Sequence, residues 1–330
     1  MSQNKNPNFV LELRSVHKRF AGPRGKGLFA SRQDVHAVDD VNLCLQRSEV
    51  LGIVGESGCG KSTVARLMTF LYPTSEGEVI VAGQNVSALP KSQVRKLRRD
   101  IQIVFQDPHA ALNPRFTVFE LISEAWKIFP DICPRKDWRN RAAELLKQVG
   151  LRPSDLGKYP SEFSGGQRQR ICIARALSME PTILVCDEPV SALDVSVQAQ
   201  VLNLLQDLQE AQDLSIVFIS HDLSVVRHVA DRVAVMYLGQ VVELGNSDSV
   251  FENPQHPYTQ ALLSVAPSDG TEAKRDRIVL SGEVPSPIDP PQGCKFHTRC
   301  WKAIDFCKST KPMLVQTTTK THQAACHLLV

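Results

Sequence analysis

The sequence predicts an α/β fold with a helical insertion, followed by an extension of different composition. Three apolar runs, at residues 50–54, 182–188 and 215–222, predict short strands that are buried on both faces of a sheet. A glycine-rich loop and an amphipathic helix follow the first run directly, which is the order of half a βαβ unit. After about residue 253, closely spaced prolines break regular structure and extend the chain.

Each element is expected from its residue period and from the turn residues beside it. A stripe of apolar residues predicts a helix from Lys61, and helical periodicity continues through most of residues 115–181. Gly150 is a helix stop, and Ser164 is an N-cap that opens a further helix at Gly165. The remaining expected elements are strands of an antiparallel edge layer at 9–16 and 79–86, and helical segments at 119–129, 138–150 and 197–212.

Length and composition describe a globular chain with room for a sizeable core. Of its 330 residues 42% are hydrophobic and 22% charged, and the formal net charge is +3. These values exclude disordered, collagen-like and coiled-coil chains, and the charge is too mild to argue for nucleic acid. The apolar runs are shorter than the roughly 18 residues that a bilayer crossing needs. The first residues do not resemble a signal peptide, so we expect the protein to stay in the cytosol.

The loop at residues 55–62 reads GESGCGKS and matches the G-x-x-x-x-G-K-[ST] pattern of a P-loop NTPase. Its glycines let backbone N–H groups turn inward around phosphate oxygens, and the next helix presents the positive end of its dipole to the same anion. Lys61 adds a positive charge for the β- and γ-phosphates, and the Ser62 hydroxyl is a ligand for Mg²⁺. The residues expected to bind nucleotide here are Gly55, Glu56, Ser57, Gly58, Cys59, Gly60, Lys61, Ser62 and Thr63.

Two carboxylates end the buried strand that follows the insertion. Alternation along the strand sends Asp187 and Glu188 to different sides, which suits Mg²⁺ binding by Asp187 and activation of the attacking water by Glu188. An acidic pair at a strand end also serves to cap the next turn. Gln106 and His221 each follow an apolar strand, at the edge where open α/β sheets place ligands, although a lone histidine there is more often structural.

Residues 163–167 read FSGGQ and lie between the glycine loop and the acidic pair. They resemble the LSGGQ signature of the ATP-binding subunits of ABC transporters, with Phe163 in place of leucine. The resemblance covers about residues 9–250 and implies an ABC ATPase fold, which has a RecA-like core, an antiparallel β edge layer and a helical subdomain. It implies a nucleotide-binding domain at 1–252, with the helical subdomain at about 107–180.

The resemblance also implies roles for single residues. Two subunits face head to tail, and each ATP lies between the glycine loop of one and the signature loop of the other, here Ser164, Gly165, Gly166 and Gln167. Gln106 corresponds to the Q-loop glutamine at Mg²⁺, and His221 to the H-loop histidine at the γ-phosphate. Asp194 corresponds to the D-loop at the dimer contact, and Phe20 to the aromatic ring that stacks on adenine.

The C-terminal segment narrows the resemblance to oligopeptide/dipeptide importers. HPYTQALLSVAP at 256–267 is similar to that branch, particularly to its second, dipeptide-type ATPase subunit. This implies a peripheral protein on the cytoplasmic side of a bacterial inner membrane that acts without nucleic acid. The implied partners are a second, paralogous ATPase subunit, two transmembrane permeases and a periplasmic or lipid-anchored peptide-binding protein. Importers of nickel, glutathione or antimicrobial peptides share this tail, and a soluble ABC ATPase acting on nucleic acid is the more distant alternative.

Four cysteines of the extension at 253–330 follow the spacing C-x5-C-x6-C-x18-C, namely Cys294, Cys300, Cys307 and Cys326. This is neither zinc-finger nor ferredoxin spacing. A small proline-rich segment is poor in core residues and needs a staple, and four thiolates suit Zn²⁺ or an iron–sulfur cluster. The resemblance to peptide importers favours [4Fe–4S], with zinc or free thiols as alternatives. His297, His322 and His327 are possible substitute ligands.

Overall fold

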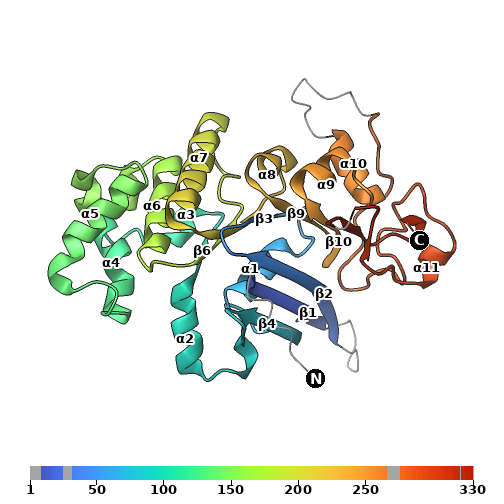
Figure 1. Ribbon diagram of the computed structural model, residues 1–330, viewed down its shortest axis with the longest axis horizontal. Helices are drawn as coiled ribbons and strands as arrows, with labels where there is room; N and C mark the ends of the chain where they lie inside the picture. Colours follow the sequence, from blue (N-terminus) through green and yellow to red (C-terminus); the bar gives the residue numbers. More distant parts are fainter. Residues whose placement is uncertain (1–8, 25–31, 266–275, 320, 330) are drawn as a thin grey trace. The chain divides into compact units, whose positions relative to one another are not determined.

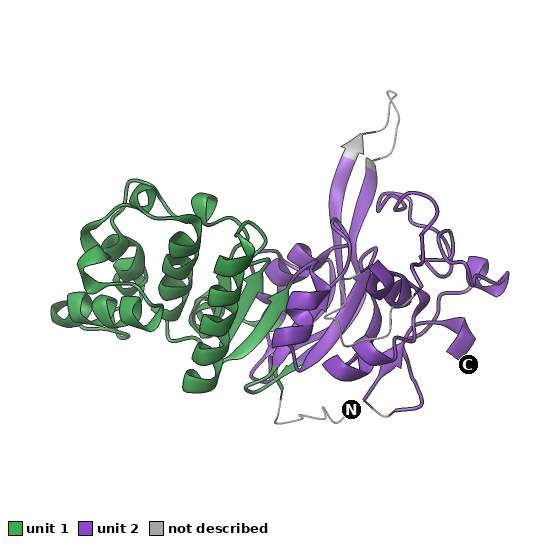
Figure 2. Cartoon of the chain, turned by 90° about the horizontal axis from the view of Figure 1, so that it is seen from above, with its two compact units in different colours: residues 1–10, 45–49, 88–219 green, residues 11–44, 50–87, 220–330 purple. Residues whose placement is uncertain are grey.

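The computed structural model describes residues 9–24, 32–265, 276–319 and 321–329 of the chain. Contacts divide the chain into two compact units, which Figure 2 shows in green and purple. Unit 1 comprises residues 1–10, 45–49 and 88–219, and unit 2 comprises residues 11–44, 50–87 and 220–330. Residues 253–330 therefore belong to the same compact unit as the glycine loop, and the predicted domain boundary at residue 252 stays a prediction.

Unit 1 combines helices with three parallel strands. β6 (Ile101–Val104), β7 (Ile183–Asp187) and β8 (Ser215–Ile219) pair in the order β8-β7-β6. Every residue of β7 and β8 is buried, which confirms the strands predicted from their apolar runs. The helices, labelled in Figure 1, are α2 (Lys91–Asp100), α3 (Pro108–Ala111), α4 (Val118–Ile128), α5 (Trp138–Gln148), α6 (Gly165–Leu177) and α7 (Val195–Gln212).

The helical insertion has its own caps and core. Thr117 and Glu120 form a capping box at the start of α4, where the Thr117 N–H donates to Glu120 Oε2 at 2.8 Å. Trp126 of the same helix is fully buried, and its indole N–H donates to the Ser178 carbonyl, just after α6, at 2.8 Å. Its indole therefore fixes α4 against the C-terminal end of α6 without leaving a buried donor unpaired.

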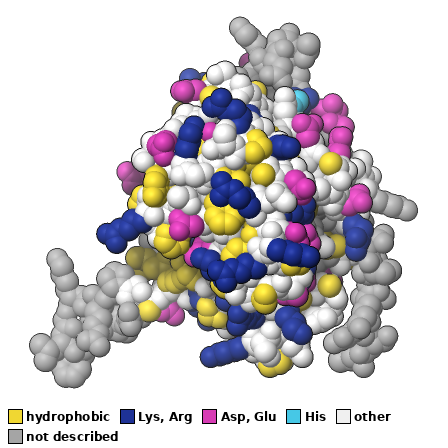
Figure 3. Space-filling view, turned by 90° about the vertical axis from the view of Figure 1, so that its left-hand side faces the viewer, with side chains coloured by type: hydrophobic (Ala, Val, Ile, Leu, Met, Phe, Trp, Pro, Cys, Tyr) yellow, Lys and Arg dark blue, Asp and Glu magenta, His cyan; other side chains and the backbone are white. Residues whose placement is uncertain are grey.

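One face of the molecule, shown in Figure 3, mixes charges of both signs with apolar side chains. In unit 1 a cavity of about 730 Å³ is lined by Arg95, Lys96 and Arg99 together with acidic residues. Arg99 Nη1 lies 2.8 Å from Asp131 Oδ2, so at least one of these three basic residues is ion-paired at the surface. Such exposed pairs contribute little to stability, about 0–1 kcal/mol each.

Unit 2 contains two sheets. In one, β3 (Val50–Val54) and β9 (Arg232–Tyr237) are parallel, and β10 (Gln240–Asn246) follows antiparallel to β9. The other sheet has the order β2-β1-β4-β5. Its members are β1 (Phe9–Arg24), β2 (Arg32–Gln46), β4 (Glu76–Val81) and β5 (Gln84–Asn85), and the helices of unit 2 are α1 (Lys61–Met68), α8 (Leu223–Val229), α9 (Ser247–Glu252), α10 (Pro257–Val265) and α11 (Phe306–Ser309).

The antiparallel edge layer was predicted, but its extent was not. β1 continues to Arg24, well past the predicted end at residue 16, because a bulge between Arg14 and His17 lets the strand resume after Ser15 turns to φ 44°. β2 was missed, since two adjacent aspartates interrupt its apolar pattern and Asp40 has φ 57°. In both strands, irregular residues interrupt the sequence pattern, so the pattern does not predict the full length of the strand.

The C-terminal extension continues the sheet of unit 2. β12 (Gln323–Ala324) pairs with β10, and β11 (Val315–Gln316) pairs with β12. The fully buried Glu243 of β10 accepts the backbone N–H groups of Gln255 and His256 at 2.7 and 2.9 Å, and contacts His322 Nε2 at 2.7 Å. One buried carboxylate therefore joins β10 to two other segments of the chain. Within the described ranges, no helix is long and apolar enough to cross a membrane.

Candidate functional site

The glycine loop joins β3 to α1, as the sequence predicts. Gly60 caps α1 with φ 105°, and a Cβ at this position would lie 2.3 Å from the Ala37 carbonyl oxygen. Only glycine tolerates both the left-handed backbone and this close approach. No side-chain hydrogen bond from Gly60 caps α1, which suits the binding of an anion at this helix N-terminus.

Lys61 is 4% exposed and lies inside the loop that precedes it. Its Nζ donates to the carbonyl oxygens of Gly55 at 2.7 Å and Glu56 at 3.0 Å. The carbonyl acceptors that hold this ammonium group are neutral. A phosphate oxygen carries a charge, so its hydrogen bond to the ammonium group is stronger than the hydrogen bonds to the carbonyl groups. The loop thus contains a positioned cation next to a helix N-terminus.

Phe20 lies in an aromatic and cationic corner of unit 2. Its ring is 5.3 Å from that of Tyr72 in an edge-on arrangement, and Lys18 Nζ lies 5.0 Å from the centre of the Phe20 ring. The ring is half-buried, so part of its surface remains open to a planar ligand. His221 also lies in unit 2, exposed between β8 and α8, where the next residue, Asp222, caps the helix.

The predicted carboxylates end β7 in unit 1. Asp187 is 3% exposed, and Glu188 has φ 50°, with its backbone N–H donating to the Ile219 carbonyl of β8 at 3.0 Å. Gln106 Nε2 donates to Glu188 Oε2 at 2.9 Å. Two predicted site residues that are 82 positions apart are therefore brought into contact.

The signature segment folds as its sequence predicts. Ser164 and Gln167 form a capping box at the start of α6, in which the Gln167 N–H donates to Ser164 Oγ at 3.4 Å and the Ser164 N–H to Gln167 Oε1 at 3.0 Å. Both side chains are exposed, whereas Phe163 is buried. A Cβ on Gly166 would lie 2.2 Å from Val197 Cγ1 of α7, so this position is restricted to glycine. The segment presents a polar helix N-terminus on a fixed base.

The two units each hold part of the predicted set. The glycine loop, Phe20 and His221 belong to unit 2, and the remaining nucleotide-site residues belong to unit 1. Asp194 is exposed and begins α7 as its N-cap residue. The glycine loop, a strand-end acidic pair and a capped signature segment together are the parts of an ATP-hydrolysing protein.

Comparisons with known proteins agree with this set of parts. The protein-family model for ABC transporters matches residues 38–191, and the model for the oligopeptide/dipeptide transporter C-terminal region matches residues 242–307. The oligopeptide transport ATP-binding protein AppF of Bacillus subtilis is 52% identical over 98% of this chain and 98% of its own length. The chain belongs to the ATP-binding proteins of ABC transporters. The dipeptide transport ATP-binding protein DppF of Haemophilus influenzae is 50% identical over 93% of both chains.

Solved ABC proteins share the fold of the nucleotide-binding part. A dimeric post-hydrolysis state of the cassette MJ0796, bound to ADP and Pi, has a TM-score of 0.63 and 31% identity over 72% of this chain and 98% of that one. CbiO1 of Clostridium perfringens, part of a cbiONQ transporter complex, has a TM-score of 0.64 and 28% identity over 74% and 92%. The predicted P-loop NTPase fold is confirmed, and as an ABC ATP-binding protein the chain is an ATPase.

Two residues that were not predicted from the sequence lie against the glycine loop. Arg299 donates to both carboxylate oxygens of Glu56, at 2.8 and 3.2 Å, and the Tyr258 hydroxyl accepts the Glu56 N–H at 2.9 Å. Both residues lie in the extension, more than 200 positions from the loop. The sequence carries no local signal for a contact of that separation.

The four C-terminal cysteines lie in one segment of unit 2 as free thiols. Burial, with a smaller contribution from the nearby Cys307, Cys300 and Cys326, raises the pKa of Cys294 to about 11. The Cys294 N–H also donates to the Cys307 carbonyl at 2.8 Å. Across the described part of the chain, no three Cys, His, Asp or Glu side chains are arranged to hold a metal ion. The Cys294 thiol is nevertheless near enough to the other three to interact with them electrostatically.

The three histidines considered as substitute ligands have other partners. His322 Nε2 contacts the buried Glu243 carboxylate, at 2.7 Å. His297 Nδ1 lies 2.8 Å from the Cys294 carbonyl oxygen, and His327 Nε2 lies 2.8 Å from the Thr310 carbonyl oxygen. One ring nitrogen of each histidine therefore serves a hydrogen bond that orders the extension.

Proposed function

We propose that this ATPase powers the import of dipeptides or oligopeptides from the cytoplasmic face of a bacterial inner membrane. The main support is that relatives named for peptide transport are similar to this chain over its C-terminal extension as well as its nucleotide-binding part. The proposed partners are a paralogous ATPase subunit, two transmembrane permeases and a periplasmic or lipid-anchored peptide-binding protein. No role is proposed for nucleic acid.

ATP binding is assigned to Gly55–Thr63, with the adenine ring against Phe20. Lys61 would bind the β- and γ-phosphates through the ammonium group that the loop already positions. Mg²⁺ would be held by the oxygen donors of Ser62, Gln106 and Asp187, a set that suits a hard cation. When bound, Mg²⁺ neutralises charge on the phosphate oxygens.

Hydrolysis is assigned to Glu188, His221 and Gln106. The Glu188 carboxylate would orient the attacking water and accept its hydrogen bond, while Gln106 keeps that carboxylate in place. His221 would contact the γ-phosphate. Phosphoryl transfer needs mainly positioning and charge neutralisation, so these groups act through geometry.

The signature segment is assigned to the ATP of a neighbouring subunit. The exposed Ser164 hydroxyl, the N–H groups of Gly165 and Gly166 and the exposed Gln167 would close over that nucleotide, with Asp194 at the dimer contact. ATP would draw the two subunits together and hydrolysis would release them. Their motion would then be passed to the permeases.

The cargo assignment is tested with the assembled transporter. The chain is co-purified from membranes with its permeases and reconstituted into vesicles, and the binding protein is loaded with dipeptide, oligopeptide, nickel or glutathione. We expect peptide-loaded binding protein to stimulate ATP hydrolysis and peptide uptake several-fold. Stimulation by nickel or glutathione alone would reassign the cargo, and co-purification with nucleic acid without permeases would refute a transport role.

A [4Fe–4S] cluster is proposed for Cys294, Cys300, Cys307 and Cys326. In such a cluster each thiolate binds a different iron, so the four sulfur atoms lie further apart than around one zinc ion. The proposal is supported by the grouping of four thiols, since Cys307, Cys300 and Cys326 lie near enough to Cys294 to influence it electrostatically.

Anaerobically purified protein is expected to be brown and to contain about four iron and four sulfide per chain. Replacing Cys307 with Ser should remove most of the iron, while replacing Cys172, buried in α6, should not. Stoichiometric zinc without sulfide would support the zinc alternative. Colourless, metal-free protein would leave the residues as free thiols.

A further inference from the structure

The extension contacts the glycine loop through one loop residue, Glu56. The Arg299 guanidinium donates to both Glu56 carboxylate oxygens, at 2.8 and 3.2 Å, and its side chain is only 9% exposed. A paired, largely buried guanidinium–carboxylate contact fixes direction as well as distance. The carboxylate of the second loop residue is therefore held by the segment that carries the four cysteines.

The backbone of Glu56 is held as well. Its N–H donates to the hydroxyl of the fully buried Tyr258 at 2.9 Å, and its carbonyl accepts from Lys61 Nζ at 3.0 Å. Burial raises the pKa of Tyr258, so the hydroxyl stays protonated and neutral. Every polar group of Glu56 thus has a partner, two from the extension and one from the loop lysine.

An aromatic cluster makes these two partners rigid. The Tyr258 ring lies 4.7 Å from Tyr237, at the end of β9, and 5.4 Å from Phe296 of the extension. The Arg299 guanidinium lies 6.0 Å from the centre of the Tyr237 ring. Since all three rings are buried, Arg299 and Tyr258 reach Glu56 from a fixed base on the central sheet of unit 2.

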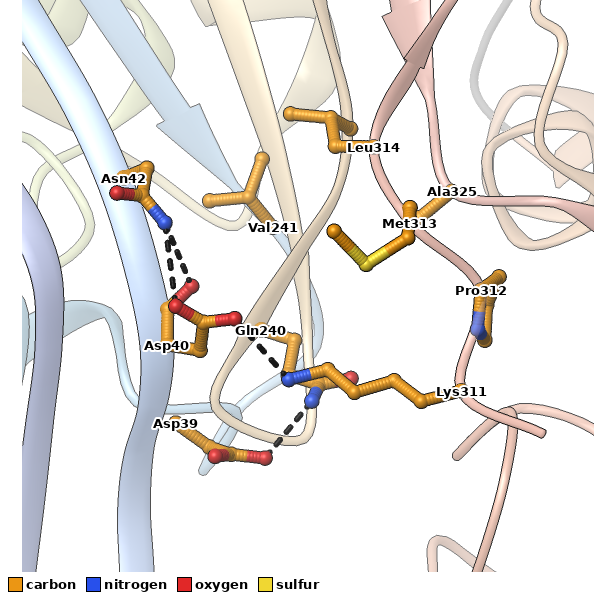
Figure 4. Close-up of a pocket in the computed structure, with 10 residues that line it drawn as sticks. All are labelled: Asp39, Asp40, Asn42, Gln240, Val241, Lys311, Pro312, Met313, Leu314 and Ala325. Carbon is orange, nitrogen blue, oxygen red and sulfur yellow. Dashed lines mark hydrogen bonds and ion pairs between the residues drawn. The ribbon is translucent and has the colours of Figure 1, made fainter. Parts of the chain in front are cut away.

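The extension makes other ion pairs that do not involve the loop. Lys295 Nζ lies 2.8 Å from Asp39 Oδ2, and Lys311 Nζ lies 3.3 Å from Asp40 Oδ2. Figure 4 shows Lys311 reaching Asp40 at a pocket of about 260 Å³ between β2, β10 and the extension. These pairs attach the extension to β2 without involving the nucleotide loop, so the contact between Arg299 and Glu56 is separate from them.

We propose that Arg299 is a positioning residue for ATP binding. It acts through Glu56 to fix the backbone of residues 55–61, and with it the two carbonyl groups that hold the Lys61 ammonium. Loss of the Arg299–Glu56 pair leaves the loop held only through the Glu56 backbone, so part of the ordering of the loop must then come from the binding of ATP itself. The inference rests on the assignment of residues 55–63 to the triphosphate.

The test compares full-length Arg299→Met, Glu56→Gln and the double variant with Lys311→Met as a matched control. The control also removes one cation that joins the extension to β2, but not at the loop. We expect Arg299→Met and Glu56→Gln each to raise the Kd for MgATP and the KM of hydrolysis about tenfold, with kcat changed less than threefold. The double variant should bind MgATP no more weakly than either single variant. The Kd of Lys311→Met for MgATP should stay within twofold of that of the unchanged protein.

Several results would overturn the proposal. One is an unchanged ATP affinity in folded Arg299→Met; another is a double variant whose effect is the product of the two single effects. Should Arg299→Met fail to fold, Glu56→Gln decides, because it leaves the extension intact. Lys61→Ala tests the assignment of the loop to ATP separately from the role of Arg299. Full ATP binding in Lys61→Ala would refute the loop assignment, whereas a normal Arg299→Met beside a defective Lys61→Ala would refute only the role of Arg299.

Discussion

Replacing Glu188 with Gln is expected to reduce ATP turnover by about a hundredfold to ten-thousandfold, the usual contribution of a positioned general base. The amide has the shape of the carboxylate and still accepts a hydrogen bond from Gln106, so the local structure should be unchanged. What is lost is the charge that polarises the attacking water. The Kd for MgATP should stay within twofold. Equilibrium binding and the rate of phosphate release measure the two quantities separately.

Two further variants make this result specific. Glu210→Gln alters an exposed carboxylate on α7 and should leave turnover unchanged. Because Glu188→Gln holds ATP without consuming it, the variant should accumulate as an ATP-bound pair of subunits. Adding Ser164→Arg at the exposed signature position should abolish that pairing while each subunit still binds ATP. Normal turnover in Glu188→Gln would refute its role as catalytic base.

Replacing Lys61 with Ala is expected to weaken MgATP binding about a hundredfold, or about 2.7 kcal/mol. That loss corresponds to removing a charge-assisted contact to the phosphates from a largely buried position. Titration of MgATP against the variant gives the affinity directly. Lys91→Ala, which removes an exposed cation from the start of α2, should bind ATP normally.

Folding must be checked for Lys61→Ala, since the substitution leaves the carbonyls of Gly55 and Glu56 without their shared donor. Leaving a buried acceptor unpaired costs about 1–3 kcal/mol, which is a measurable shift in melting temperature but not the loss of the fold. A variant that melts cooperatively and still binds MgATP as tightly as the unchanged protein would contradict the assigned role of Lys61.

Local patterns were enough to predict the local structure at the expected nucleotide-binding residues. The loop before Lys61 and the cap at Ser164 are set by residues within a few positions of each other, and both appear as expected. The contact between Gln106 and Glu188 was not predictable from pattern alone. It arises because β6 and β7 are neighbours in a parallel sheet, and the family resemblance supplied the functional link.

The extension was the least predictable part, for a physical reason. Prolines and scattered cysteines suggested a module apart from the core, whereas its ordering contacts are single side chains reaching distant elements, such as His322 to Glu243. A contact across 79 positions leaves no period in the sequence. Such contacts depend on burial and charge pairing, which only the folded chain reveals.

The buried Glu243 has a consequence for how the protein is made. Its carboxylate needs donors from residues 255 and 256 and from His322, and His322 is made 79 residues after Glu243. A nascent chain that has released only its nucleotide-binding residues carries an uncompensated charge on β10, which is then the edge strand of the emerging sheet. Final packing around β10 must therefore wait until residue 322 has been made, and during that interval the chain exposes an unfinished sheet edge to proteases and chaperones.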